Sequence, residues 1–354
     1  MLTSIVRAAL RAWPALLALL CAMTAAAAGT GLQPGRGGAE GDMRVHPPEI
    51  LLAQYGQQQD TQGEPATESL AVLFPDIGEP YRGVFMQIIE GIRERARLPV
   101  HVHPVRAGID PAALRAALKR DSARGLIALG RQGMRTASAL DLDVPVVVGG
   151  VLAVPKDQVE TLNAITLTPD PALLFAHLKR MLPGVRRVIV VYDPRQNDWL
   201  IRLAREAARD QGLELVAHEA QDMATAARLY EAALAVSEGR HDAVWLPQDS
   251  TTVDEATILP LVLRESWERG VPLFSSSLVH ARRGALFALY PDNVELGQAL
   301  AVTAQVAMKD GGRRRGVLPL RDVRIAVNLR TASHLGLHFS YQQQRSFDLT
   351  FPEP

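Results

Sequence analysis

Short apolar runs alternate with amphipathic stretches along most of the chain. The first run, residues 70–74 (LAVLF), predicts a buried strand, and the stretch 81–97 then places its isoleucines on one face of a helix. Asp110-Pro111 predicts another helix start, with an N-cap aspartate and a proline at the first helical position. Such alternation indicates sheets of parallel strands that helices cover on both faces.

The same reading extends to the rest of the chain. We expect strands at 70–74, 100–105, 125–129, 144–148, 164–167, 187–192, 214–218, 243–246, 273–275 and 285–289. We expect helices at 81–97, from 110, and at 131–140, 170–181, 199–211, 223–238, 254–269 and 294–309. The pattern restarts at Asp170-Pro171, so the fold class is α/β, with two doubly wound parallel-sheet lobes.

The first 28 residues differ in kind from the rest. Arg7 and Arg11 precede an apolar run at 13–23, and alanines follow at 25–28. This pattern is typical of a cleavable signal peptide, with cleavage near Ala26 to Ala28. Lipidation at Cys21 is not favoured, because Leu20 precedes the cysteine where a small residue is needed.

The charge balance and the cysteine content restrict which partners and which cellular compartment are expected. Lys plus Arg equals Asp plus Glu, 38 against 38, so no general attraction to nucleic acid or to a membrane surface is expected. Cys21 is the single cysteine, so the mature chain would lack disulfides and cysteine metal sites. An exported chain of this kind suits a periplasm.

Residues 29–67 are rich in Gly, Gln, Pro and Glu and predict a flexible tether, although 49–52 could dock as a short helix.

The downstream half carries a recognisable series of motifs. They are 244–251 (VWLPQDST), 272–277 (PLFSSS), 284–289 (GALFAL), 290–297 (YPDNVELG), 326–332 (AVNLRTA) and 335–337 (LGL). Together they resemble the ABC-transporter substrate-binding protein family that includes tryptophan/tyrosine-type uptake proteins. The resemblance spans about residues 70–337 and implies the type I periplasmic binding fold.

The resemblance also implies three hinge crossings between the lobes, which would allow closure around a ligand. Lobe one would hold 70–167 plus 292–316, lobe two 168–291 plus 317–340, and 341–354 would form a C-terminal tail.

Ligands of open α/β sheets bind beyond the carboxyl ends of the strands. In lobe one this rule selects the loops 76–81, 130–133 and 149–151, and in them Asp76, Tyr81, Arg131, Gln132, Gly149 and Gly150. In lobe two it selects the loops 192–199, 248–251 and 275–277, and in them Tyr192, Trp199, Gln248, Asp249, Ser250, Ser275 and Ser276.

Each candidate has a structural alternative. Arg131, at a predicted helix start, would favour a carboxylate or phosphate, or it is a solvated arginine in a plain turn. Asp249 would bind a ligand ammonium, or it caps a helix. Tyr81, Tyr192 and Trp199 would form an aromatic wall, or they belong to the core.

No catalytic motif of the hydrolase, metalloprotease or nucleotide-binding kind occurs, so we expect no enzyme, no catalytic residue, no cofactor and no metal. The leading hypothesis is a periplasmic solute-binding protein that closes around a small organic, amino-acid-like ligand and delivers it to an ABC importer. The alternative is a periplasmic sensing module that signals to a membrane sensor protein.

Overall fold

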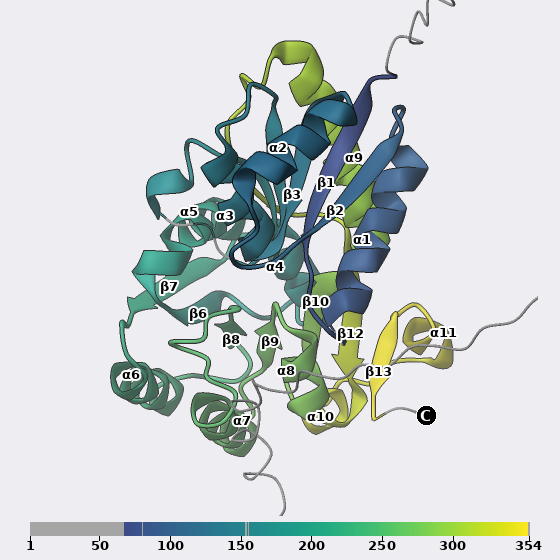
Figure 1. Ribbon diagram of the computed structural model, residues 1–354. Coiled ribbons are helices and arrows are strands. Elements are labelled where there is room, and N and C mark those ends of the chain that lie inside the picture. The colour runs from purple at the N-terminus through teal and green to yellow at the C-terminus, as the bar shows by residue number, and fades with distance from the viewer. Residues whose placement is uncertain (1–66, 80, 153, 155, 353–354) are drawn as a thin grey trace, which may run out of the picture. The chain divides into compact units, whose positions relative to one another are not determined.

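The computed structural model describes residues 67–79, 81–152, 154 and 156–352 (Figure 1). The expected signal peptide, residues 1–28, and all of the expected tether except Thr67 lie outside the described residues. None of the helices within the described ranges is long and apolar enough to cross a membrane.

The first sheet has six strands: β1 (Ser69–Pro75), β2 (Val100–Val105), β3 (Ala123–Leu129), β4 (Val146–Val151), β5 (Asn163–Pro169) and β11 (Gly316–Leu320). Their order is β11-β5-β4-β3-β1-β2, and every neighbouring pair is parallel. All seven residues of β1 are buried, as the apolar run predicts for a central strand covered on both faces.

Helices cover both faces of this sheet. One face packs against α1 (Tyr81–Arg95) and α9 (Asn293–Asp310), and the other packs against α2 (Pro111–Arg120) and α3 (Gly130–Leu140). The two helices α1 and α9 lie side by side although about 200 residues separate them, as Figure 1 shows. We call this sheet with its helices lobe one.

The second sheet has seven strands: β6 (Arg187–Tyr192), β7 (Glu214–Glu219), β8 (Asp242–Leu246), β9 (Leu273–Ser275), β10 (Phe287–Pro291), β12 (Val323–Asn328) and β13 (Leu349–Phe351). Their order is β13-β12-β10-β9-β8-β6-β7, and only the β10–β12 pair among the described strands is antiparallel. With its helices, this sheet forms lobe two.

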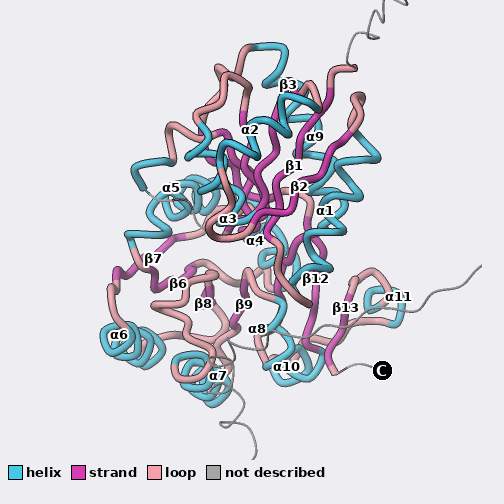
Figure 2. Tube along the Cα trace, viewed as in Figure 1, coloured by secondary structure: helices cyan, strands magenta, loops and turns pink. Residues whose placement is uncertain are grey.

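The helices of lobe two follow the same two-faced plan (Figure 2). One face packs against α4 (Pro171–Met181) and α5 (Pro194–Asp210), and the other packs against α6 (Met223–Ala235) and α7 (Ile258–Arg269). Three short helices complete the lobe: α8 (Leu278–Arg283), α10 (Leu329–His334) and α11 (Tyr341–Gln344). The expected fold class, with two α/β lobes, is confirmed.

The chain crosses between the lobes after β5, after β10 and after β11. The third crossing differs from the expected boundary at 316/317, because β11 pairs with β5 in the first sheet and the crossing follows Leu320. The expected tail also differs, since β13 within it pairs with β12. An edge strand that is recruited by backbone hydrogen bonds needs no long apolar run, so the hydrophobic pattern did not reveal either strand.

Two arginines of the third crossing bind aspartates of the other two. Arg321 donates to the carboxylate of Asp170 at 2.8 Å, and Arg324 donates to that of Asp292 at 2.6 Å. Both aspartates are also N-caps, of α4 and α9 respectively. The three crossings are therefore linked to one another by ion pairs.

Candidate functional site

A cavity of about 840 Å³ lies where the strands of both lobes end. Its lining residues are Arg131, Met134, Arg135, Ser138, Ala139, Val154, Gln158, Arg195, Gln196 and Ser250. The lobe-one residues follow the carboxyl ends of β3 and β4, and the lobe-two residues follow those of β6 and β8. This is the position at which open α/β sheets bind their ligands.

The lobe-one wall is mainly one face of α3. Arg131, Arg135 and Ser138 stand at positions i, i+4 and i+7, so their side chains share that face. Both arginines are exposed, and neither forms a hydrogen bond or an ion pair within the described residues. Buried Met134 and Val154 supply apolar surface beside them. This wall thus offers two free cations.

The lobe-two wall is the start of α5. Asp193 is its N-cap and accepts from the backbone N–H of Arg195 at 3.0 Å. The Arg195 guanidinium also donates to the Asp193 carboxylate, with its closest contact at 2.5 Å. This hydrogen-bonded pairing lowers the pKa of Asp193 and raises that of Arg195. The charge of Arg195 is therefore balanced within lobe two, while Gln196 beside it is a neutral polar group.

Asp249 lies at the end of β8, but its carboxylate is buried and fully engaged. One oxygen accepts from the backbone N–H of Asp193 and from Asn197 Nδ2, both at 2.8 Å. The other accepts from the backbone N–H groups of Thr251 and Thr252 at 2.9 and 3.1 Å. Asp249 thus joins the loop after β8 to the start of α5, in keeping with its structural alternative, and Ser250 next to it lines the cavity.

The other lobe-two candidates are internal. Tyr192 and Trp199 belong to the core; the Tyr192 hydroxyl donates to Glu219, and burial above all raises its pKa to about 12. Ser275 and Ser276 are fully buried. Ser276 accepts from the Trp245 indole at 3.2 Å. Gln248, at the end of β8, is half-buried and does not line the cavity.

The remaining lobe-one candidates also lie off the cavity. Asp76 pairs with Arg106 at 2.5 Å, and Tyr81 is exposed at the start of α1. Gln132 donates to Thr136 within α3. Two of the candidates, Gly149 and Gly150, pack inside lobe one. A Cβ on Gly149 would overlap the Leu300 side chain of α9. Gly150 adopts a φ of 66° and lies beside Phe85. Of the sequence candidates, Arg131 and Ser250 are the two that the structure brings together at the cavity.

Two further arginines line the cavity: Arg135 lies outside every candidate loop, and Arg195 lies inside the candidate loop 192–199 but was not singled out. Arg135 is one helical turn from Arg131, so the predicted helix 131–140 already implied that both share a face. Arg195 was not singled out because the helix was expected only from 199, whereas α5 begins at Pro194. Asp193-Pro194 is the same start signal as Asp110-Pro111, and it would have placed Arg195 in the first turn of the helix.

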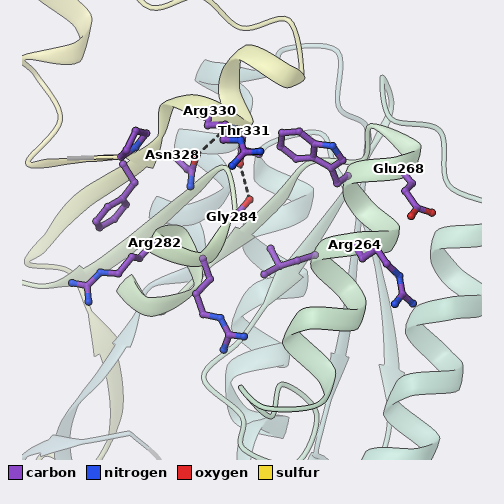
Figure 3. A pocket seen from close by; sticks show the side chains of 12 residues that line it. Arg264, Glu268, Arg282, Gly284, Asn328, Arg330 and Thr331 are labelled. Atoms are coloured by element: carbon purple, nitrogen blue, oxygen red, sulfur yellow. Dashed lines mark hydrogen bonds between the residues drawn. The ribbon is translucent and has the colours of Figure 1, made fainter. Parts of the chain in front are cut away.

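A second concave region, of about 730 Å³, lies at the opposite edge of lobe two, where β10 begins (Figure 3). Figure 3 shows Arg264 and Glu268 on α7, Arg282 on α8 and Arg330 on α10. Within it, the Arg330 guanidinium lies over the Trp267 ring at 5.6 Å. This region receives residues from lobe two alone, so closure of the lobes could not enclose a ligand there.

No group of three or more His, Cys, Asp or Glu side chains in the described part of the chain could hold a metal ion. His280 is a buried titratable residue that the sequence reading passed over. Its Nδ1 lies 2.7 Å from Ser275 Oγ, and burial above all lowers its pKa to about 4. With both side chains inaccessible, this pair is a structural contact that ties α8 to the end of β9.

Two α/β lobes joined by three crossings, with a cavity at the strand ends of both, have the fold of the type I periplasmic binding proteins. The sequence matches the family of ABC transporter substrate binding proteins over residues 118–340. The chain belongs to that family, which confirms the resemblance seen in its motifs. This is a family of substrate-binding proteins and not of enzymes.

Solved structures share the fold at low sequence identity. The ligand-free, open structure of CD0873, a substrate binding protein with adhesive properties from Clostridium difficile, is 14% identical with a TM-score of 0.56, and the match covers 80% of this chain and 98% of that one. A conserved domain protein from Vibrio cholerae is 18% identical with a TM-score of 0.49, over 80% and 99%.

An ABC domain from Streptococcus pneumonia, solved in complex with L-Trp, is 15% identical with a TM-score of 0.46, and the match covers 80% of this chain and 100% of that one. No curated protein matches the sequence.

Proposed function

We propose that the protein is an exported solute receptor, which binds a small organic ligand between its lobes and delivers it to an ABC importer in the membrane. The observation that carries the proposal is the cavity lined from the strand ends of both lobes. A ligand held there contacts both lobes, so it stabilises their closed arrangement. Membership of the substrate-binding family supports the same role.

The compartment and the partner follow from that role. The basic and apolar pattern of residues 1–28 favours export, which puts the receptor in the periplasm beside the permease. The expected partners are therefore a small molecule and a membrane transporter.

Native mass spectrometry of freshly purified protein tests the binding role, because a ligand retained through purification adds its mass to the protein. A thermal-shift screen with charged, zwitterionic and neutral solutes complements it, since a ligand that binds the folded state raises the melting temperature. Absence of both a bound mass and any stabilisation would contradict the proposal.

Transport is separable from the sensing alternative by genetics and by affinity capture. A strain that lacks the protein loses uptake of the identified ligand if the protein serves an importer. Normal uptake, together with capture of a membrane sensor protein by the ligand-loaded receptor, would instead support sensing.

A further inference from the structure

The charges that line the interlobe cavity are of one sign. Among the described residues that line it, three are arginines and none is an aspartate or a glutamate. Arg195 is balanced by Asp193, but Arg131 and Arg135 have no counter-charge within the described residues. Two like charges one turn apart on a helix destabilise it slightly, so their placement favours a bound anion.

The two buried carboxylates beside the lobe-two lining residues do not offset this positive charge for a ligand. Asp193 and Asp249 follow the strand ends of lobe two, and both are buried. Asp193 is bound by Arg195, and Asp249 accepts four hydrogen bonds from its own lobe. A ligand ammonium could reach either of these two carboxylates only by breaking one of these contacts, and a buried donor left unpaired is costly.

We propose, on the basis of the proposed binding function, that the ligand is a small organic anion without an ammonium group. Arg131 and Arg135 bind its anionic head, a carboxylate or a phosphate, through charge-assisted hydrogen bonds from lobe one. Gln196 and Ser250 bind neutral polar atoms of its body from lobe two.

The remaining lining residues fit the body of such a ligand. Met134, Ala139 and Val154 present apolar surface next to the arginines, while Ser138 and Gln158 add neutral hydrogen-bonding groups. An organic acid with a short apolar or hydroxylated chain matches this combination, because its charge is at one end only. The ligand ammonium that the sequence suggested for Asp249 would need a free carboxylate there, and that carboxylate is engaged.

A matched set of solutes tests the charge requirement. The full chain is titrated by calorimetry and by thermal shift with 3-phenylpropionate, phenylalanine and phenethylamine, and with succinate, aspartate and putrescine. Glycerol 3-phosphate and inorganic phosphate distinguish a phosphate head from a carboxylate head. We expect anions without an ammonium group to bind at least tenfold more tightly than their zwitterionic partners, and binding to weaken as NaCl rises from 50 to 500 mM.

Substitutions of the two arginines test whether they bind the anion. Arg131→Gln and Arg135→Gln are each expected to weaken anion binding by tenfold or more, and Arg135→Lys by less, since it keeps the charge but loses the planar fork. Arg264→Gln, in the second concave region, is the matched control and should bind as the wild type does. Circular dichroism spectra and melting temperatures show whether each variant folds; both arginines are exposed, so their loss leaves the core intact.

The outcomes separate the two proposals. Preference for phenylalanine or aspartate over its deaminated counterpart would overturn the anion inference and leave the binding function standing. Wild-type anion affinity in both glutamine variants would also overturn it. If no solute of any charge binds and no bound mass is found, the binding function itself fails.

Discussion

Single residues at the strand ends of lobe two divide sharply between structural and ligand-facing roles. Asp249 and Ser250 are neighbours in sequence, yet the first is buried with four hydrogen-bond donors around it and the second is exposed at the cavity. Sequence alone could not distinguish them, because both are polar residues in the same loop and only the donors around each one decide its role.

Replacing Asp249 and Ser250 in turn shows which of the two side chains stabilises the fold. Asp249→Asn removes the charge and aims an amide N–H₂ at groups that are themselves donors, so we expect the free energy of unfolding to fall by about 2–4 kcal/mol. Ser250→Ala is the neighbouring control and should change it by less than about 0.5 kcal/mol. Urea titrations give both values, and a wild-type stability for Asp249→Asn would contradict the structural role.

His280 predicts a pH dependence of stability. Its pKa is about 4 in the folded protein and near 6.5 when unfolded, because burial disfavours the charged ring. The unfolded chain therefore takes up the proton first as the pH falls, and stability is lost between about pH 6.5 and pH 4. From pH 8 to pH 5 the loss is about 2 kcal/mol.

His280→Gln removes this titration, so the comparison with wild type isolates the contribution of His280 from that of other groups. Unfolding free energies at pH 8 and pH 5 provide the measurement. A variant that loses as much stability as the wild type over this range would show that His280 is not the responsible group.

At the scale of helices and strands, local sequence signals were the most reliable guide. The Asp-Pro pairs at 110–111 and 170–171 start helices as expected, with each aspartate side chain accepting from the helix. The strands β11, β12 and β13 were missed. β11 and β13 are short and pair at a sheet edge, where the partner and not the strand's own composition makes it a strand, whereas β12 lies between β10 and β13. The packing of α1 on α9 could not be predicted from the hydrophobic pattern either, because it joins distant parts of the chain.

That packing predicts a steric effect at two glycines. A Cβ on Gly91 of α1 would lie 1.9 Å from the backbone oxygen of Val294, and one on Gly297 of α9 would lie 2.0 Å from that of Ile88. Gly91→Ala and Gly297→Ala must force the helices apart, so we expect each to lower the free energy of unfolding by about 2–3 kcal/mol despite the better helix propensity of alanine.

Gly83→Ala is the control within the same helix α1. Its Cβ would meet only the end of the Glu79 side chain, at 3.3 Å, so helix propensity should dominate and stability should stay level or rise by up to about 1 kcal/mol. Thermal and urea unfolding of the three variants measure these changes in stability. Equal effects at all three glycines would argue against close packing of α1 on α9.

At the scale of the whole molecule, the three crossings form one connected unit. Arg321 and Arg324 of the third crossing bind Asp170 and Asp292 of the first two, and the backbone N–H of Asp170 donates to Leu320 O at 2.8 Å. Both arginine side chains are half or more exposed, so each ion pair contributes at most about 1 kcal/mol to stability. Their larger effect is expected on the hinge, because they restrain how the crossings rotate.

The double variant Arg321→Gln/Arg324→Gln tests this restraint. We expect the ligand-free protein to sample a wider range of distances between the lobes, while the free energy of unfolding falls by less than about 2 kcal/mol. Spin labels on Glu90→Cys in lobe one and Glu231→Cys in lobe two, in a Cys21→Ser background, report that distance by electron paramagnetic resonance; both positions are exposed.

Arg314→Gln removes a comparable ion pair, to Asp310 at 3.5 Å, that lies within lobe one, and it should leave the distance distribution unchanged. High salt should broaden the wild-type distribution toward that of the double variant, because screening weakens exposed pairs. If the distance distribution of the double variant is unchanged, the backbone of the three crossings restrains the hinge without help from the ion pairs.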